Sequence, residues 1–303
     1  MKIVFLGTGG GFPSKDRGVS AVAVRVNGEI VLFDCGEGTQ RQLMSSTFSY
    51  MRIIRIFISH FHGDHFLGIA GLVQSMCLNN RTSPLDIYGP EGTIRTITEF
   101  LKLGYFNQTM PVTSHELEGG EVLQFPNYSV TVVAADHMVP ALSFVLEEPE
   151  RKGTFNPRKA KELGITEGPE FRRLQNGETI VINGSEVRSD MVMGKPRSGR
   201  KIAYTGDTRP VPEFEELVRG ADVLIHESTF HSDMEEKSME FGHTTSRQAA
   251  ELAARAGVRK LFLTHISNRY SKDPSPLIDE AEEIFPEAEL ARDFLEYEVP
   301  KQM

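Results

Sequence analysis

The sequence Ser59-His60-Phe61-His62-Gly63-Asp64-His65 places three imidazoles and one carboxylate within six positions, 60 to 65. It follows the apolar, β-branched run 53–58, which predicts a buried strand. Gly63 allows the backbone to turn, and the apolar stretch 66–73 predicts a helix after the turn. The four polar side chains are therefore expected at the carboxyl end of a strand.

This combination of side chains predicts a metal site. Imidazole and carboxylate ligands suit a borderline cation such as zinc, and His60 and His62 point the same way along an extended chain. Asp64 and His65 project differently from the turn, so the loop could serve two metal ions. The alternatives are a solvated polar loop and a single structural metal, but the density of His-x-His-x-Asp-His argues against both.

The composition is that of an ordinary globular protein. The chain has 303 residues, of which 39% are hydrophobic and 25% charged. We expect a cytoplasmic protein without a membrane contact, because the sequence contains no long apolar run and its first residues do not have a signal-peptide layout. Cys35 and Cys77 are too few for a disulfide scaffold, which predicts two buried small side chains.

The charge is unevenly distributed. The net charge of −9 argues against a nucleic-acid partner. Residues 151–201, however, contain twelve Lys and Arg against six Asp and Glu, a net +6, which leaves −15 on the rest. Frequent Gly and Pro and few apolar residues predict an inserted, flexible basic arm over 151–195, with a short helix near 158–163 and little core, within a single domain of 1–303.

A glycine-rich loop follows the first predicted strand, at residues 2–6. Its sequence, Gly7-Thr8-Gly9-Gly10-Gly11-Phe12-Pro13, departs from a dinucleotide-binding fingerprint because Phe12 stands where the third glycine belongs and Pro13 continues the loop. We therefore expect no nucleotide cofactor. The loop could instead present Lys15 and Arg17 to an anionic partner.

Other polar residues also stand at strand ends. A hairpin around Asn27-Gly28 leads to Asp34, which could orient a metal-bound histidine or serve only as a turn or cap residue. Because open sheets bind ligands at the carboxyl edge of their strands, one shared site is expected there. Strands and helices in both halves predict two sheets packed face to face, with helices outside. The further strand-end residues are His137, Asp207, Glu227 and His265.

Thr245 and Gln248 have the spacing of a capping box and predict the start of a helix. Among the strand-end residues, His60, His62 and His137 would make a three-nitrogen site, and Asp64, His65 and His265 a mixed one. Asp207 remains as a carboxylate able to bridge two cations.

Seven motifs of the chain resemble those of the short form of the tRNase Z (RNase Z) family. The resemblance spans essentially the whole chain and implies an α/β fold, the αββα four-layer sandwich of the metallo-β-lactamase fold. The motifs are Phe33-Asp34-Cys35-Gly36-Glu37-Gly38-Thr39-Gln40, the His-x-His-x-Asp-His loop, Asp136-His137, Tyr204-Thr205-Gly206-Asp207-Thr208, His226-Glu227-Ser228-Thr229, Phe241-Gly242-His243-Thr244-Thr245 and Leu263-Thr264-His265.

The resemblance implies a zinc-dependent endoribonuclease that removes the 3′ trailer of precursor tRNA near the discriminator base and leaves a 3′-hydroxyl. It implies two Zn²⁺ ions per subunit, with Mn²⁺ or another divalent metal possible, and a homodimer. Asp207 would lie between the two ions, and Asp64 would also orient the attacking hydroxide or accept its proton. His243 would protonate the leaving oxygen, with Glu227 orienting the imidazole.

The basic arm would bind phosphates without reading sequence, as suits an enzyme that serves many tRNAs; the alternative is a solvated basic loop. The family's loop reads Pro-x-Lys-x-Arg-Asn, whereas this chain has Gly18 at its last position, which bears on discrimination against mature CCA ends. The predicted arm contacts are Arg151, Lys152, Arg158, Lys159, Lys161, Arg172 and Arg173.

Three other functions would each account for part of the same set of motifs. A small-molecule phosphodiesterase or other hydrolase of this fold would keep the metals and need no basic arm. A redox di-iron protein would be expected to have a Glu in the metal loop. A non-catalytic RNA-binding protein with a structural metal would need neither His243 nor Glu227. Metal-dependent turnover separates the last class from the hydrolases.

Overall fold

The computed structural model describes residues 1–182 and 184–301, which fall into two compact units. The first unit joins Met1–Glu147 to Arg200–Pro300, and the second is formed by Glu148–Gly199. No described helix has both the length and the apolar character needed to cross a membrane.

The first unit is built on two seven-stranded sheets. A separate parallel pair joins β2 (Gly9–Gly10) to β16 (Ile266–Ser267). In spatial order, the first sheet contains β18 (Glu296–Glu298), β1 (Lys2–Gly7), β3 (Ala21–Val26), β4 (Glu29–Phe33), β5 (Ile53–Phe57), β6 (Leu85–Gly89) and β7 (Val112–Glu116). The second contains β17 (Ala288–Leu290), β15 (Leu261–Thr264), β14 (Val223–Glu227), β13 (Lys201–Tyr204), β10 (Leu142–Glu147), β9 (Ser129–Ala134) and β8 (Val122–Gln124).

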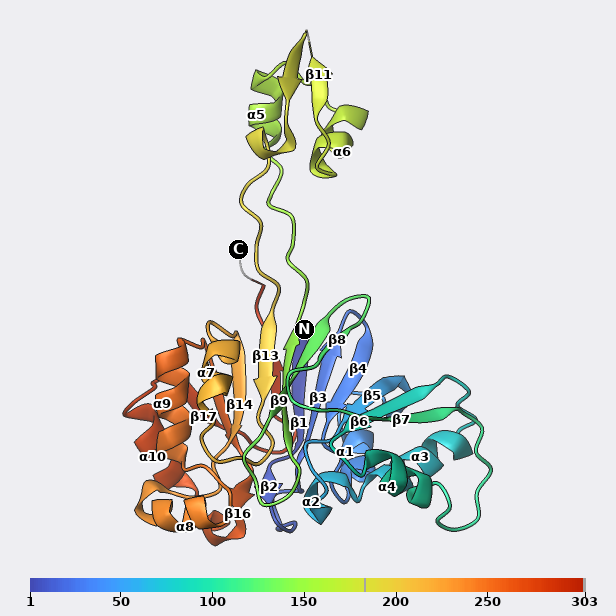
Figure 1. Cartoon of the computed structure of the whole chain (residues 1–303), viewed down its shortest axis with the longest axis vertical. Helices are drawn as coiled ribbons and strands as arrows, with labels where there is room; N and C mark the ends of the chain where they lie inside the picture. The colour runs from blue at the N-terminus through green and yellow to red at the C-terminus, as the bar shows by residue number, and fades with distance from the viewer. Residues whose placement is uncertain (183, 302–303) are drawn as a thin grey trace. The chain divides into compact units, whose positions relative to one another are not determined.

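The two sheets pack against each other through an aromatic core and carry helices on their outer faces. The inner core includes Phe33, Phe57 and Phe144, whose rings lie within 6 Å of one another. Helices lie on the outer side of each sheet (Figure 1). A separate apolar cluster lies beneath the helices of each outer face. The predicted αββα sandwich is therefore confirmed. The first sheet carries α1 (Thr39–Ser45), α3 (Ile69–Leu78) and α4 (Thr93–Phe100), and the second carries α7 (Pro212–Val218), α9 (Ser246–Ala256) and α10 (Ser275–Glu282).

Local signals in the sequence account for several elements. Asn27 and Gly28 have φ of 48° and 89°, as a two-residue turn between antiparallel β3 and β4 requires. Thr245 and Gln248 form the predicted capping box of α9. Strands β4, β5 and β6 are parallel, as are β13, β14 and β15, so within each set the carboxyl ends lie at one edge.

Other elements differ from the sequence prediction. The helix expected over 66–73 is divided into α2 (Gly63–Phe66) and α3, because the loop after β4 comes so close that a Cβ on Gly68 would lie 2.1 Å from the Gly36 oxygen. The short strands β7, β8, β17 and β18 and the helix α8 (Glu235–Glu240) were not predicted. The remaining short helices are η1 (Tyr50–Arg52), η3 (Ser232–Met234) and η4 (Asn268–Tyr270).

The second unit has a small core, in line with the expectation of little core. The predicted short helix is α5 (Pro157–Glu162), but α6 (Pro169–Gln175) and the hairpin of β11 (Ile180–Ile182) and β12 (Ser185–Val187) were not predicted. A 3₁₀ helix, η2 (Ser189–Met191), follows. The division of the chain into a single domain of 1–303 with an inserted arm over 151–195 remains a prediction. The core consists of Ala160, Ile165, Phe171, Leu174, Ile180, Val187 and Val192.

Candidate metal centre

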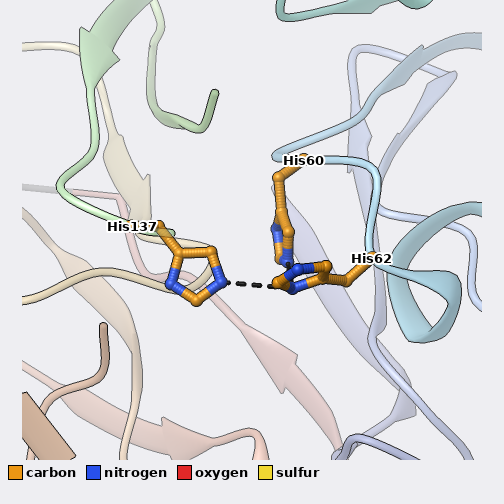
Figure 2. A group of neighbouring side chains, drawn as sticks. All are labelled: His60, His62 and His137. Atoms are coloured by element: carbon orange, nitrogen blue, oxygen red, sulfur yellow. Dashed lines mark hydrogen bonds between the residues drawn. The ribbon is translucent and has the colours of Figure 1, made fainter. Parts of the chain in front are cut away.

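Three imidazoles meet just beyond the ends of β5 and β9. His62 Nδ1 lies 3.0 Å from His60 Nε2 and 3.2 Å from His137 Nε2. Figure 2 shows the three rings directed toward one another. Nitrogen ligands at 2.0–2.1 Å from a tetrahedral zinc would be about 3.3 Å apart, so the spacing fits one metal ion. The predicted three-nitrogen group is therefore brought together in the fold.

A second group mixes carboxylate and imidazole. Asp64 Oδ2 lies 3.4 Å from His65 Nε2 and 3.2 Å from His265 Nε2, and the two Nε2 atoms are 3.3 Å apart. The helix α2 begins at Gly63 and turns Asp64 and His65 away from the extended residues before it. The group again fits a divalent cation.

Asp207 lies between the two groups. Its Oδ2 is 3.7 Å from His60 Nε2, 3.4 Å from His65 Nε2 and 3.2 Å from His265 Nε2. Its Oδ1 is buried and has no hydrogen-bond partner among the described residues. A buried carboxylate oxygen without a partner is costly unless a cation approaches it, which supports a metal ion at this place.

Buried hydrogen bonds fix the orientation of His65 and His60. Asp34 Oδ2 accepts from His65 Nδ1, from the Ser59 hydroxyl and from the Tyr204 hydroxyl, each at 2.7 Å. The Ser59 oxygen in turn accepts from His60 Nδ1 at 3.0 Å. Because both rings donate their Nδ1 proton away from the cluster, their Nε2 lone pairs face it. Asp34 thus has the orienting geometry that the sequence suggested for it.

Two further imidazoles, those of His137 and His265, are held in the same way. His137 Nδ1 donates to the Gly242 carbonyl at 2.7 Å, and His265 Nδ1 donates to the Thr229 hydroxyl at 2.8 Å. The Thr229 hydroxyl donates to Glu227 Oε2 at 2.5 Å, so its oxygen is available to accept. Both Nε2 atoms are therefore free to bind a cation.

The electrostatics of the cluster favour a positive charge. Burial and the neighbouring His65 hold the pKa of His60 well below its usual range, so His60 is a neutral ligand. Burial opposes ionisation of Asp64, but hydrogen bonds from His265 and His65 outweigh it and lower the pKa of this carboxyl. Burial also opposes a charge on His65, yet Asp207 and then Asp34 raise its pKa well above the ordinary value. The pocket thus favours cationic character where a metal would bind.

A histidine–carboxylate pair stands beside the cluster. His243 Nδ1 lies 3.0 Å from Glu227 Oε1, which also accepts from the Thr208 backbone N–H at 2.9 Å. Burial lowers the pKa of His243, but the Glu227 carboxylate outweighs it and the pKa rises to about 9. His243 therefore carries a proton at neutral pH, which is the state that an acid catalyst needs.

Comparisons with known proteins give the family. The chain is 46% identical to ribonuclease Z of Methanosarcina mazei over 99% of this chain and 98% of the relative. It is 43% identical to ribonuclease Z of Archaeoglobus fulgidus over 98% and 97%. The chain belongs to the ribonuclease Z family. The predicted family and the prediction of an enzyme are both confirmed.

Structural comparison agrees with this ribonuclease Z assignment. The crystal structure of human tRNase Z, short form, matches with a TM-score of 0.73 and 30% identity over 99% of this chain and 100% of that one. A metallo-beta-lactamase fold protein from Bacillus subtilis matches with a TM-score of 0.70 at 21% identity, which bears on the fold alone. The family descriptions that match are "Anti-Pycsar protein Apyc1" over residues 1–153 and "Beta-lactamase superfamily domain" over residues 190–266.

In this member of the ribonuclease Z family, a cavity of about 700 Å³ opens onto four of the predicted metal ligands and the His243 ring. One of its walls is formed by the glycine-rich loop, whose Gly11 N–H donates to Asp64 Oδ2 at 2.6 Å. The cavity is large enough for part of a polymeric substrate. It is lined by Gly10, Gly11, Phe12, His62, Asp64, Asp207, Thr229, His243, His265, Ser267, Asn268 and Arg269.

The two predicted loop cations have different surroundings. The Lys15 side chain is exposed. Arg17 Nη1 donates to Thr8 Oγ1 and to the Ala291 carbonyl, both at 2.6 Å, so this guanidinium holds the loop in place. Asp293 completes the anchor by accepting from the Gly18 N–H, the Thr8 hydroxyl and the Gln42 amide at 2.7–2.8 Å.

The second unit presents most of the predicted arm cations to solvent. Lys152, Arg158, Lys159 and Arg172 are exposed. Lys161 and Arg173 are exposed as well but have carboxylate neighbours, Glu167 at 3.9 Å and Glu178 at 2.8 Å. Arg151 is half-buried.

Sequence reasoning missed three residues that orient this centre, Ser59, Tyr204 and Thr229. It also missed Asp293, which anchors the glycine-rich loop. Tyr204 and Thr229 stand in motifs that were singled out for Asp207 and Glu227, so their position was a usable signal. Asp293 is 275 positions from its partner Gly18, and nothing local in the sequence marks it.

Proposed function

We propose that this enzyme removes the 3′ trailer from precursor tRNA by hydrolysing one phosphodiester near the discriminator base, leaving a 3′-hydroxyl. Its ribonuclease Z relatives support this reaction. The observation that carries it is a cavity lined by His243, which is paired with Glu227, and by four members of the seven-residue cluster of imidazoles and carboxylates, namely His62, Asp64, Asp207 and His265. Such a cavity can both activate water and protonate a leaving alkoxide.

The proposed metal ligands divide into two sets. His60, His62 and His137 would hold one divalent cation, and Asp64, His65 and His265 would hold the other, with the Asp207 carboxylate shared between them. Two such ions, which we propose to be zinc, would polarise the scissile phosphate and lower the pKa of the attacking water.

The remaining steps use the chain's own groups. Asp64 would orient the attacking water and accept its proton. His243 would donate the proton to the ribose 3′ oxygen that leaves, and Glu227, 3.0 Å away, would keep the imidazole charged and directed into the cavity. Thr229 links this pair to the metal cluster, because its hydroxyl lies between Glu227 and His265.

Phosphates remote from the cut would be bound by cations outside the cavity. Exposed Lys15 and the basic side chains of the second unit suit this role, since such contacts position RNA without reading its sequence. Arg17, which the sequence suggested for the same role, is better suited to anchoring the loop. A homodimer and a cytoplasmic location are also part of the proposal, on the strength of the family resemblance.

The test is cleavage of an end-labelled precursor tRNA with a 3′ trailer by metal-reconstituted enzyme, with an Asp64→Ala variant as control. We expect a single cut near the discriminator that leaves a 3′-hydroxyl, is abolished by a chelator and is lost in the variant. Metal content measured in parallel should give two ions per chain. Hydrolysis of a small phosphodiester without any cut in RNA would refute the proposal and favour a small-molecule phosphodiesterase.

A further inference from the structure

One side chain of the catalytic cavity has no role in the reaction so far described. Among the described residues that line the cavity, Arg269 is the only lysine or arginine. Every other charged or titratable group of the lining is a histidine or aspartate of the catalytic cluster. A polyanionic substrate that enters this cavity therefore meets one fixed cation outside the cluster.

The Arg269 guanidinium makes only weak contacts within the protein. Its Nη1 lies 2.9 Å from the thioether sulfur of Met234, a weak acceptor, and its Cζ lies 5.8 Å from the centre of the Phe230 ring. No carboxylate of the described residues pairs with it, whereas Arg209, for example, binds Asp136 at 2.9 Å. Most of the five N–H donors of Arg269 thus remain available for a ligand.

The segment that carries this guanidinium is held on two sides. It belongs to η4 (Asn268–Tyr270), which directly follows strand β16. Asn268 Nδ2 donates to the Phe12 carbonyl of the glycine-rich loop at 2.8 Å, and the Tyr270 hydroxyl accepts from the His231 backbone N–H at 3.0 Å. The cation is therefore presented from an anchored backbone, which reduces the entropic cost of binding.

Phe230 indicates on which side of the cut this cation lies. Its ring centre is 6.0 Å from that of His243, and the same ring lies 5.8 Å from the Arg269 guanidinium. The cation and the proposed acid therefore share one wall of the cavity. Because His243 would protonate the leaving 3′ oxygen, the nucleotide that carries this oxygen would lie along the wall formed by His243 and Arg269.

We propose that Arg269 binds the phosphate on the 5′ side of that nucleotide, the first phosphate on the tRNA side of the cut. The inference rests on the proposed function and names one substrate contact within it. A guanidinium can bind two phosphate oxygens at once, which fixes the direction of the strand as well as its charge. This contact would hold the leaving oxygen against His243.

The experiment is a double-mutant cycle between the side chain and the phosphate. Arg269→Gln and wild-type enzyme are assayed on precursor tRNA with a methylphosphonate, which lacks the negative charge, at that single phosphate. Each change alone should lower kcat/KM by about 10- to 100-fold, as expected for loss of a charged hydrogen bond, and both together by no more than one alone. Arg269→Lys should recover part of the loss.

A matched control is Lys272→Gln, which removes one exposed charge three positions away and outside the cavity lining. The fold-decrease in kcat/KM caused by Lys272→Gln should be independent of the methylphosphonate, so the two decreases should multiply when both changes are present. The inference would be overturned if the decreases for Arg269→Gln and the methylphosphonate also multiplied, or if Arg269→Gln left kcat/KM unchanged. If wild-type enzyme does not cut the unmodified precursor, the proposed function itself fails, so the two failures are distinguishable.

Discussion

The charge on the His243 ring depends mainly on the Glu227 carboxylate, with a smaller contribution from Asp207. Glu227 lies 3.0 Å from His243 Nδ1 and keeps the imidazole protonated, with a pKa of about 9. We predict that His243→Ala lowers kcat for precursor tRNA by about 10²- to 10⁴-fold, the usual contribution of a general acid. Metal content should not change, since His243 lies outside both predicted ligand sets.

The leaving group provides the decisive comparison for this prediction. A precursor with sulfur in place of the 3′ oxygen at the cut needs no protonation of its leaving group, so His243→Ala should lower its cleavage rate far less. His231→Ala, a change of a histidine outside the cavity lining, is the matched control and should leave both rates unchanged. An equal loss on both substrates would rule out the acid role.

Asp34 allows a second prediction at the residue scale. It has a φ of 56°, a backbone conformation that Asn tolerates, so Asp34→Asn tests its charge without added strain. The amide would place a donor or a weaker acceptor opposite His65, Ser59 and Tyr204, which all donate to Asp34. We expect zinc affinity to fall by about 10- to 100-fold, as measured by competition with a chromophoric chelator.

The control for Asp34 is Asp222→Asn, which changes another buried aspartate that accepts from the Lys201 backbone N–H. This change should lower the thermal unfolding temperature without altering zinc affinity. If both variants bind zinc equally well, Asp34 has no orienting role and its hydrogen bonds serve only the fold.

The two-residue strand β2 packs directly against one predicted ligand, His265. A Cβ added to Gly10 would lie 2.5–2.8 Å from three ring atoms of His265, so Gly10→Ala must displace that imidazole. We expect loss of one metal ion per chain and a decrease in activity of at least about 100-fold, because loss of positioning in a catalytic site is costly. Metal analysis and the precursor cleavage assay test this.

Gly9→Ala is the control within the same strand. Its Cβ would meet Arg17 Cβ at 3.2 Å and a backbone oxygen at 3.3 Å, a mild contact that does not involve a ligand. Metal content should therefore remain at the wild-type value in Gly9→Ala. Equal metal loss in both variants would mean that the strand, rather than the contact with His265, determines binding.

Elements that depend on neighbouring residues were predictable from the sequence, and those that depend on distant contacts were not. The hairpin at Asn27-Gly28 and the capping box at Thr245 involve residues at most three positions apart, and both are present. The break at Gly68 is different, because its cause is the Gly36 carbonyl, 32 positions away. Strands β17 and β18 have only three residues each, too few for periodicity to reveal them.

The same distinction applies to the site. The metal loop could be found because four candidate ligands occur in six positions. The three distant ligands, His137, Asp207 and His265, could be found because each follows a strand that ends at the same sheet edge. The network around them joins Asp34 to Tyr204 across 170 positions and Thr229 to His265 across 36. Such partners follow only from the folded chain.

At the scale of the whole molecule, the second unit is inserted between two paired strands. Strands β10 and β13 are antiparallel neighbours, with Glu147 opposite Lys201. A tight turn can therefore replace residues 149–199 without breaking the sheet. We predict that an Asn-Gly turn at this place leaves metal content and hydrolysis of a small phosphodiester intact but weakens binding of precursor tRNA strongly.

The physical reason is electrostatic. Residues 149–199 contain ten Lys and Arg against seven Asp and Glu, a net charge of +3 on a chain of −9, so the shortened protein has a net charge of −12 and lacks the exposed cations of the second unit. Each lost phosphate contact lowers the slope of log Kd against log salt by about 0.7–0.9, and loss of several contacts should lower it by at least about 2. Changing Lys159, Lys161, Arg172 and Arg173 to Gln in the intact chain should lower the slope in the same direction, since it removes charge but keeps the unit's core. Loss of small-substrate hydrolysis together with RNA binding, or an unchanged salt slope in the charge variant, would contradict a docking role for the second unit.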